Sequence, residues 1–262
     1  MLPTDASTDA DTALAAQTAP VSARAAGART RAGTDPGAAT DCEDTLDLRL
    51  PDELIALFTA GPEQTGGTTG NAGDLLDGVG DWGPVTTTAG VFQLVPVRTE
   101  RDVPLVSRWM NDPAVAAFWE LAGHESVVEK HLRPQTDGDG RSVPCLGVLD
   151  GIPMSYWEIY RADLDPLARH YPARPHDTGI HLLIGTVADR GRGLGTALLR
   201  AVADHILDRR PACARVVAEP DLRNTPSVSA FLSAGFRYSA EVDLPDKRAA
   251  LMVRERGLRA LL

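Results

Sequence analysis

The stretch Arg190-Gly191-Arg192-Gly193-Leu194-Gly195-Thr196 decides the fold, because it joins an apolar stretch (residues 179–185) to one with helical periodicity (residues 193–209). Glycines let the backbone turn tightly and direct several N–H groups to one point. At a helix N-terminus those donors, the helix macrodipole and the two arginines favour an anion such as a diphosphate. The stretch therefore predicts a strand, an anion-binding loop and a helix; an ordinary tight loop with solvated arginines is the simpler alternative.

Two other phosphate-binding motifs do not match this stretch. A dinucleotide-binding fingerprint requires G-x-G-x-x-G, whereas the glycines here follow G-x-G-x-G. A P-loop requires G-x-x-x-x-G-K-[ST], and the only lysines of the chain are Lys130 and Lys247. The pattern that remains is R-x-x-G-x-G at the start of a helix.

Residues 90–262 alternate between strand-like and helix-like stretches. Residues 144–149 and 154–160 are typical of an antiparallel hairpin that turns at Asp150-Gly151. We expect further strands at residues 91–97, 179–185, 214–218, 236–242 and 249–254, and helices at residues 103–110, 112–119, 125–132, 193–209 and 225–234. This order predicts an α/β sandwich with a mixed sheet.

The acidic excess lies entirely in the first third of the chain. Residues 1–89 hold 14 acidic and 4 basic side chains, whereas residues 90–262 hold 22 of each. Residues 1–40 consist almost entirely of Ala, Thr, Asp, Gly, Ser, Pro and Arg, which is too little apolar bulk to offset the entropy of ordering. We therefore expect residues 1–89 to form an acidic, largely disordered extension with one short helix near residues 51–59, and residues 90–262 to form the folded domain.

Composition also limits the partners and the compartment. A neutral domain gives no electrostatic reason to bind nucleic acid, and no apolar run is long enough to span a bilayer. The N-terminus has neither a basic nor an apolar signal region, and Cys42, Cys145 and Cys213 are too far apart for a zinc knuckle. We expect a cytoplasmic protein that acts on a small molecule, with no nucleic-acid or membrane partner and an oligomeric state that the sequence does not predict.

Several separated motifs resemble one family. Besides the glycine loop, they are W-M-N-D-P-x-V-x-x-F-W (residues 109–119), Y-W-E-I-Y (156–160), Y-P-A-R-P-H-D-T-G-I-H-L-L-I-G (171–185), A-E-P-D-L-R-N (218–224) and L-P-D-K-R-A-A-L-M (244–252). Together they are similar to the GCN5-related N-acetyltransferase (GNAT) superfamily. Within the superfamily, they look like the branch of enzymes that acylate lysine, N-hydroxylysine or N-hydroxycadaverine in the assembly of hydroxamate siderophores of the aerobactin, mycobactin and desferrioxamine types. The resemblance covers residues 91–255 and implies a mixed, mostly antiparallel sheet flanked by helices.

The resemblance implies an acyl-CoA-dependent N-acyltransferase with acetyl-CoA or succinyl-CoA as co-substrate. In the superfamily, the strand before the glycine loop and the next strand splay apart, and the acyl-pantetheine arm lies in the gap. The residues implied to bind the coenzyme are Leu183, Ile184, Gly185, Arg190, Gly191, Arg192, Gly193, Leu194, Gly195, Thr196 and Asn224. A cap on the helix that follows is the alternative role for Asn224.

His181 is the leading catalytic candidate, because it is the one polar residue of an apolar strand. Strand alternation places its side chain on the same face as Leu183. In the resembled branch, the equivalent histidine and an acid on the next strand serve the site. That acid corresponds to Glu219, and Asp221 is the second candidate. The alternative for His181 is a buried structural histidine.

The nucleophile of the resembled branch affects how much a base is needed. A hydroxylamine nitrogen is far less basic than an alkylamine and is already neutral at pH 7. A strong base is then dispensable, and a histidine–carboxylate pair mainly orients the acceptor and accepts a proton late. An ordinary lysine amine is more basic, so its acylation would depend more strongly on that base.

Aromatic and acidic residues near the centre of the sheet are candidates for the acceptor pocket. The residues expected to bind the acceptor are Trp119, Tyr156, Trp157, Glu158 and His181, with Tyr160 as a further candidate. Glu158 would attract a distal ammonium group of a diamine. Alternation places Tyr156, Glu158 and Tyr160 on one face of a strand and Trp157 on the other. Packing in the core is the alternative for the aromatic residues.

One position departs from the superfamily pattern. Many GNAT enzymes carry a tyrosine four residues before a Gly-Phe pair, and this tyrosine protonates the leaving thiolate. Here Phe231 stands at that spacing from Gly235-Phe236. A phenyl ring has no proton to give, so another group must serve the departing sulfur.

Two other functions remain open at this point. An aminoglycoside 6′-N-acetyltransferase shares the W-x-N-D-P motif, but an aspartate usually stands there in place of His181. A catalytically inactive CoA-binding regulatory module is the second alternative. We predict no metal site, because His124-Glu125 lacks the second histidine of an H-E-x-x-H motif and no cysteine pair lies near another histidine.

Overall fold

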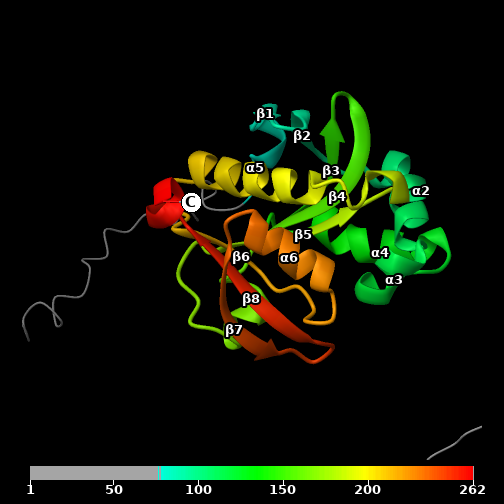
Figure 1. The fold of residues 1–262 in the computed structure, drawn as a ribbon. Helices are drawn as coiled ribbons and strands as arrows, with labels where there is room; N and C mark the ends of the chain where they lie inside the picture. Colours follow the sequence, from blue (N-terminus) through cyan, green and yellow to red (C-terminus); the bar gives the residue numbers. More distant parts are fainter. Residues whose placement is uncertain (1–75, 77, 262) are drawn as a thin grey trace, which may run out of the picture. The chain divides into compact units, whose positions relative to one another are not determined.

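The computed structural model describes residue 76 and residues 78–261 (Figure 1). Its eight strands are β1 (Val85–Thr87), β2 (Gly90–Pro96), β3 (Ser142–Leu149), β4 (Ile152–Arg161), β5 (Thr178–Ile184), β6 (Arg215–Ala218), β7 (Arg237–Asp243) and β8 (Arg248–Glu255). Its α-helices are α2 (Thr99–Met110), α3 (Pro113–Trp119), α4 (Glu125–Thr136), α5 (Leu194–Arg209) and α6 (Thr225–Ser233). Short 3-10 helices lie at η2 (Val79–Asp81), η3 (Pro166–Arg169), η4 (Val187–Asp189) and η5 (Arg256–Leu261).

The strands form one mixed sheet in the order β1-β2-β3-β4-β5-β6-β8-β7. Every neighbouring pair is antiparallel except β5 and β6. The β3–β4 hairpin turns at Asp150 and Gly151, whose φ angles of 48° and 81° are those of the primed turn that a two-residue hairpin prefers. The predicted fold class, with its mostly antiparallel sheet, is confirmed.

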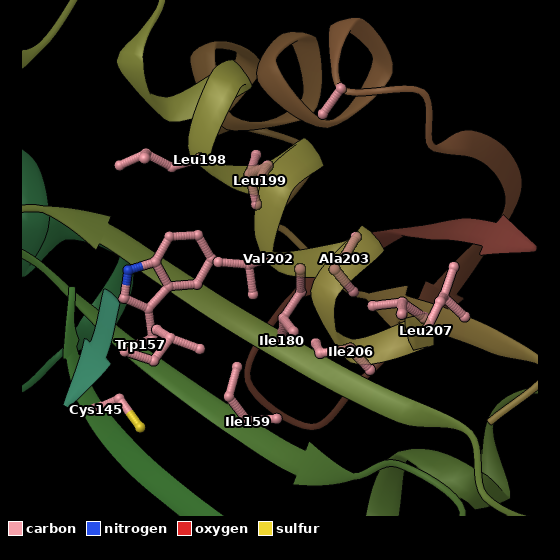
Figure 2. Close-up of a cluster of buried hydrophobic side chains, with 14 of the residues drawn as sticks. Cys145, Trp157, Ile159, Ile180, Leu198, Leu199, Val202, Ala203, Ile206 and Leu207 are labelled. Atoms are coloured by element: carbon pink, nitrogen blue, oxygen red, sulfur yellow. The ribbon is translucent and has the colours of Figure 1, made fainter. Parts of the chain in front are cut away.

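Helices cover both faces of the sheet. On one face, α5 runs across the strands and packs Leu198, Leu199 and Val202 against the Trp157 ring of β4 (Figure 2). On the other face, α2, α3 and α4 pack against β3, β4 and β5 around Leu146 and Tyr156. Alternation along β4 thus sends neighbouring side chains into two different layers.

Two helices are longer than the sequence predicted. Helix α2 begins at Thr99 rather than near residue 103. The Asp102 side chain accepts a hydrogen bond from the Arg98 N–H (2.8 Å), which gives this backbone donor at the start of the helix a partner. Helix α4 continues to Thr136 with Pro134 inside it. This extension brings one more turn of α4 over the sheet.

The folded domain begins before residue 90, which corrects the predicted boundary. Leu76, Val79 and Trp82 are buried in the α5-side core, and β1 pairs with β2 at the sheet edge. A stretch rich in glycine and threonine therefore contributes a strand and three core residues. The predicted short helix near residues 51–59 and the predicted disorder of residues 1–75 lie outside the described residues.

Among the described residues, no helix is long and apolar enough to cross a membrane. Likewise, residues 76 and 78–261 contain no group of three His, Cys, Asp or Glu side chains arranged to hold a metal ion. Cys145 and Cys213 are both buried and free.

Candidate active site

The sheet opens between β5 and β6. The two strands pair only at Thr178↔Val216 and Gly179↔Val217. From Ile180 onward, none of the described strands pairs with this edge of β5, and a cleft of about 840 Å³ lies beside it. The predicted coenzyme residues that line the cleft are Leu183, Ile184, Arg190, Gly191, Gly193, Gly195, Thr196 and Asn224.

The glycine loop forms one end of this cleft. Gly191 and Gly193 have φ angles of 69° and 77°, which disfavour any residue with a Cβ atom. A Cβ atom placed on Gly191, Gly193 or Gly195 would meet nothing within 4 Å, so side chains here would project into open space. No side chain caps the start of α5 at Gly193. The loop thus offers uncapped N–H donors and room for an anion.

The Arg190 side chain holds the loop rather than facing an anion. Its guanidinium donates to the Ile184 and Gly185 carbonyls (3.1 and 2.9 Å) and to the Asp112 carboxylate (2.8 Å). Asp112 also caps α3 by accepting from the Ala114 N–H. Arg190 therefore ties the end of β5 to the start of α3, a role that differs from the diphosphate contact that the sequence predicted for its side chain.

Three other predicted coenzyme residues, Gly185, Arg192 and Leu194, do not line the cleft. The Gly185 N–H bonds to the Met154 carbonyl, and a Cβ atom at Gly185 would stand 2.3 Å from the Trp109 ring. Glycine is needed there for the packing of α2. Arg192 is exposed, and its nearest acid is Asp189 at 3.9 Å.

His181 lies between two carboxylates. Its Nδ1 is 2.8 Å from Glu158 Oε2 on β4, and its Nε2 is 2.5 Å from Glu219 Oε1, just after β6. Glu158 and His181 are directly opposite in the β4–β5 register, which places both side chains on one face. A carboxylate only accepts hydrogen bonds, so both imidazole nitrogens carry a hydrogen atom. The pairing of His181 with Glu219 agrees with the prediction, whereas that with Glu158 was not predicted.

Charges and hydrogen bonds within the triad of Glu158, His181 and Glu219 determine which of the three groups are protonated. Burial on its own lowers the pKa of His181, but the charges of Glu219 and Glu158 and their hydrogen bonds outweigh it and raise that pKa to about 10. Burial opposes ionisation of Glu219, yet His181 lowers the pKa of Glu219 to about 2. Burial likewise opposes ionisation of Glu158, but the His131 and His181 hydrogen bonds hold its pKa well below the usual range. His181 is therefore an imidazolium at neutral pH.

Glu158 is saturated by protein donors. Its Oε1 accepts from His131 Nε2 (2.6 Å), the Tyr156 hydroxyl (2.8 Å) and Gln135 Nε2 (3.0 Å). Each carboxylate oxygen thus already accepts a hydrogen bond from the protein. Glu158 therefore positions His181, which differs from the predicted contact with a substrate ammonium group. His131 and Gln135 come from α4 and were not predicted, because nothing in the local sequence indicates that this helix crosses β4.

The second carboxylate has its own support. Glu219 Oε2 accepts from the Tyr160 hydroxyl (2.7 Å), and the Lys247 ammonium lies 3.9 Å from Glu219 Oε1. The sequence offered two acids, and the geometry distinguishes them. Asp221 bonds to Arg223 (2.6 Å) and to no histidine among the described residues. Of the two, Glu219 is the partner of His181.

A second cavity of about 270 Å³ lies over this triad. Trp119, Glu158, His181, Glu219, Asp221, Asn224 and Lys247 are among its lining residues. Tyr156 is fully buried beneath it, with its ring against Trp119 (centroids 5.5 Å apart). After the roles that the sequence predicts for their lining residues, we refer to this cavity as the acceptor pocket and to the larger one as the coenzyme cleft.

Trp157 does not belong to the acceptor pocket, which corrects the prediction. Its side chain is fully buried on the opposite face of β4, where it packs under α5 (Figure 2). The indole Nε1–H donates to the Ser155 hydroxyl (2.9 Å). Strand alternation already separated Trp157 from Glu158, so one of the two had to lie away from the pocket.

Asn224 caps helix α6, the role that was given as the alternative to binding the coenzyme. Its side-chain oxygen accepts from the Ser227 N–H (3.2 Å) at the start of α6. It also lines both cavities. The cap therefore fixes the helix end that borders the site.

A comparison with protein-family models decides the family. The model of the acetyltransferase (GNAT) domain matches residues 98–244, which is more than half of the chain. The chain belongs to the GNAT acetyltransferase family. It is an acyltransferase, and GNAT acetyltransferases use acyl-CoA as co-substrate.

Relatives of this GNAT protein include named acyltransferases. The lysine N-acyltransferase MbtK of Mycobacterium sp. (strain MCS) is 34% identical over 168 residues, which cover 64% of this chain and 68% of the relative. The N(6)-hydroxylysine O-acetyltransferase of Escherichia coli is 36% identical over 155 residues, 59% of this chain and 49% of the relative. Among solved structures, an uncharacterized protein from Bacillus halodurans is 34% identical with a TM-score of 0.64, covering 68% of this chain and 92% of that one.

The departure at Phe231 is visible in this GNAT site. Phe231 is buried, packs edge-to-face against Phe236 and borders both cavities. No hydroxyl is present on this side chain to serve a leaving thiolate. The proton for the sulfur must come from elsewhere.

Proposed function

We propose that this GNAT enzyme acylates the nitrogen of an N-hydroxylated lysine or diamine side chain, with acyl-CoA as donor, to form a hydroxamate for siderophore biosynthesis. The relatives support this reading, because their names give lysine and N(6)-hydroxylysine as acceptors. Such a reaction uses acyl-CoA and would place the enzyme in the cytoplasm and in iron acquisition.

The observation that carries the proposal is the clamping of His181 by Glu158 and Glu219 at 2.8 and 2.5 Å. An imidazole that donates from both nitrogens cannot take a proton from an ammonium group. An alkylamine, with a pKa near 10.4, is almost fully protonated at pH 7 and would need such a base. A hydroxylamine nitrogen arrives neutral and does not.

The chain's own groups would hold the coenzyme. The uncapped N–H groups at the start of α5 and the space over Gly191, Gly193 and Gly195 suit a diphosphate. The open edge of β5 from Ile180 to Ile184 suits an extended pantetheine arm, whose amides match free backbone groups. When bound, acyl-CoA supplies an acyl group activated as a thioester.

The acceptor would enter over the triad. Its neutral nitrogen attacks the thioester carbonyl, so that a C–N bond forms and the C–S bond breaks. Glu219 lines the pocket, and its oxygens can each accept a further hydrogen bond, so it would orient the N-hydroxyl group. The His181 imidazolium would supply positive charge beside the oxygen that becomes more negative. Fixing both reactants in adjoining cavities supplies much of the rate.

Acyl transfer by the purified full chain tests the proposal. The protein is incubated with acetyl-CoA or succinyl-CoA and one acceptor at a time: N-hydroxycadaverine, N6-hydroxylysine, cadaverine, lysine or an aminoglycoside. Thiol release measures the rate, and mass spectrometry identifies the products. We expect hydroxamate from the hydroxylated acceptors. Turnover of the aminoglycoside alone, or of no acceptor, would contradict the proposal.

A substitution at His181 separates catalysis from coenzyme binding. His181→Ala should lower acyl transfer ~100-fold while calorimetry finds coenzyme A affinity nearly unchanged. His170→Ala is the matched control, because His170 is exposed after η3 and lines neither cavity. A His181→Ala variant as active as the wild type would contradict the role of His181, whereas a wild type that binds coenzyme A and transfers no acyl group would favour an inactive binding module.

A further inference from the structure

The reaction must take place where the coenzyme cleft and the acceptor pocket meet. A bond between an acyl group in one cavity and a nitrogen in the other forms only at their shared wall. Six of the described residues line both cavities, namely Phe118, Trp119, Leu182, Asn224, Ser227 and Phe231.

Ser227 is the member of this set that carries a hydroxyl. It stands in the first turn of α6, one turn before Phe231 and on the same side of the helix. Its N–H is used by the Asn224 cap (3.2 Å), and within residues 76 and 78–261 no hydrogen bond engages its hydroxyl. The side chain is half-buried. A free hydroxyl therefore stands at the junction, on the helix where the tyrosine is missing.

The other polar groups at or beside the junction cannot relay a proton. Both nitrogens of His181 donate to carboxylates, so the ring has no lone pair for the acceptor's proton. Asn224 uses its side-chain oxygen as a cap, and the Trp119 indole is a donor without an acceptor lone pair. A serine hydroxyl both donates and accepts, which a proton relay requires.

We propose that Ser227 is a catalytic residue that relays the proton from the attacking nitrogen to the departing sulfur. The proposal rests on the proposed acylation of a nitrogen. As the C–N bond forms, the N–H proton passes to Ser227 Oγ; as the C–S bond breaks, the hydroxyl's own proton passes to the sulfur, and the serine ends unchanged. The thiol and the hydroxamate leave with no net proton taken from the enzyme.

Activity provides the first test. Ser227→Ala should lower kcat ~100-fold with little change in KM for the acyl-CoA, and Ser227→Thr, which keeps the hydroxyl, should recover most of that loss. Thr225→Ala is the matched control, because Thr225 is an exposed hydroxyl residue of the same turn that lines neither cavity. A Ser227→Ala enzyme within twofold of the wild type, or one no slower than Thr225→Ala, would overturn the proposal.

The thiol of bound coenzyme A provides a second test that needs no acceptor. Its ionisation can be followed by the ultraviolet absorbance of the thiolate in the complex with the full chain. A hydroxyl that donates to sulfur stabilises the thiolate, so Ser227→Ala should raise the thiol pKa by about 1 unit, while Thr225→Ala leaves it unchanged. An unchanged pKa in Ser227→Ala would contradict the relay.

The two tests separate the possible failures. A wild-type chain that acylates no hydroxylamine would contradict the proposed function. A wild-type chain that does so, with an equally fast Ser227→Ala variant, would contradict only the role of Ser227. The thiol titration shows in either case whether Ser227 donates to the sulfur.

Discussion

At the scale of single residues, the site depends on a histidine that has two acidic partners. A histidine with one carboxylate can act as a base, because its second nitrogen keeps a lone pair. His181 has none to spare, since Glu158 and Glu219 each accept from one nitrogen. The predicted late transfer of a proton to His181 therefore has no lone pair to receive it, and the residue is better suited to supplying positive charge.

The pH dependence of acyl transfer follows from this charge state. His181 keeps its proton up to a pKa of about 10, so the rate should show no inflection from it near pH 6.5 and should decline as pH rises toward 10. In Glu158→Gln, one anion is lost and the pKa of His181 should fall toward neutrality, which moves the decline to lower pH. Steady-state kinetics from pH 6 to 10 would measure both profiles.

Two outcomes would contradict this account of His181. One is a wild-type profile that rises through an inflection near pH 6.5 that His181→Ala lacks, as a neutral histidine base would give. The other is a Glu158→Gln profile that coincides with that of the wild type. Titration of the ring by nitrogen NMR offers a direct check on the same group.

At the scale of elements, the site is built where regular structure ends. Strands β5 and β6 pair through only two residue pairs, and Gly193, which precedes helix α5, has a left-handed conformation. Arg190 fixes this region by joining the end of β5 to the cap of α3. We therefore expect binding of the coenzyme to depend on backbone geometry more than on side-chain charge.

Gly193→Ala tests the role of that backbone. The φ angle of 77° at Gly193 makes alanine unfavourable by roughly 1–2 kcal/mol, and the added methyl group projects into the loop's open space. Calorimetry should find coenzyme A affinity reduced ~10-fold, about 1.4 kcal/mol. Gly257→Ala is the control, since its surroundings are equally open and its φ angle is ordinary. Equal affinities in the two variants would contradict a backbone-built anion site.

The elements also show what the sequence could predict. Gly191, Gly193 and the Asp150-Gly151 turn were predictable, because each needs a conformation that few residues adopt. The alternation of Glu158 and Trp157 was predictable as well, but which face meets the pocket depends on where α5 packs. His131 and Lys247 reach the site from α4 and from the β7–β8 loop, across contacts that no local pattern encodes.

At the scale of the whole molecule, the N-terminal boundary is the largest difference from the sequence-based prediction. Val85–Thr87 consists of β-branched residues that favour a strand, but three residues are too few to identify one, and the strand is defined by its pairing with β2. Trp82 packs edge-on against His205 of α5 (centroids 5.6 Å apart). Composition alone could not separate these residues from a linker.

Two shortened chains test this boundary. A chain that starts at residue 90 loses Leu76, Val79 and Trp82 from the core, and each such side chain contributes about 1.5–3 kcal/mol when buried. Thermal unfolding should show a clearly lower Tm for this chain than for one that starts at residue 75. Equal Tm values would contradict the inclusion of residues 76–89 in the fold.

The central claim is that the enzyme acylates a nitrogen that arrives neutral, beside a histidine that stays charged. A competition at pH 7 measures this most directly, with equal concentrations of N6-hydroxylysine and lysine, limiting acyl-CoA and mass spectrometry of the products. We predict that the hydroxamate will greatly exceed the amide. An excess of acyl-lysine would contradict the account.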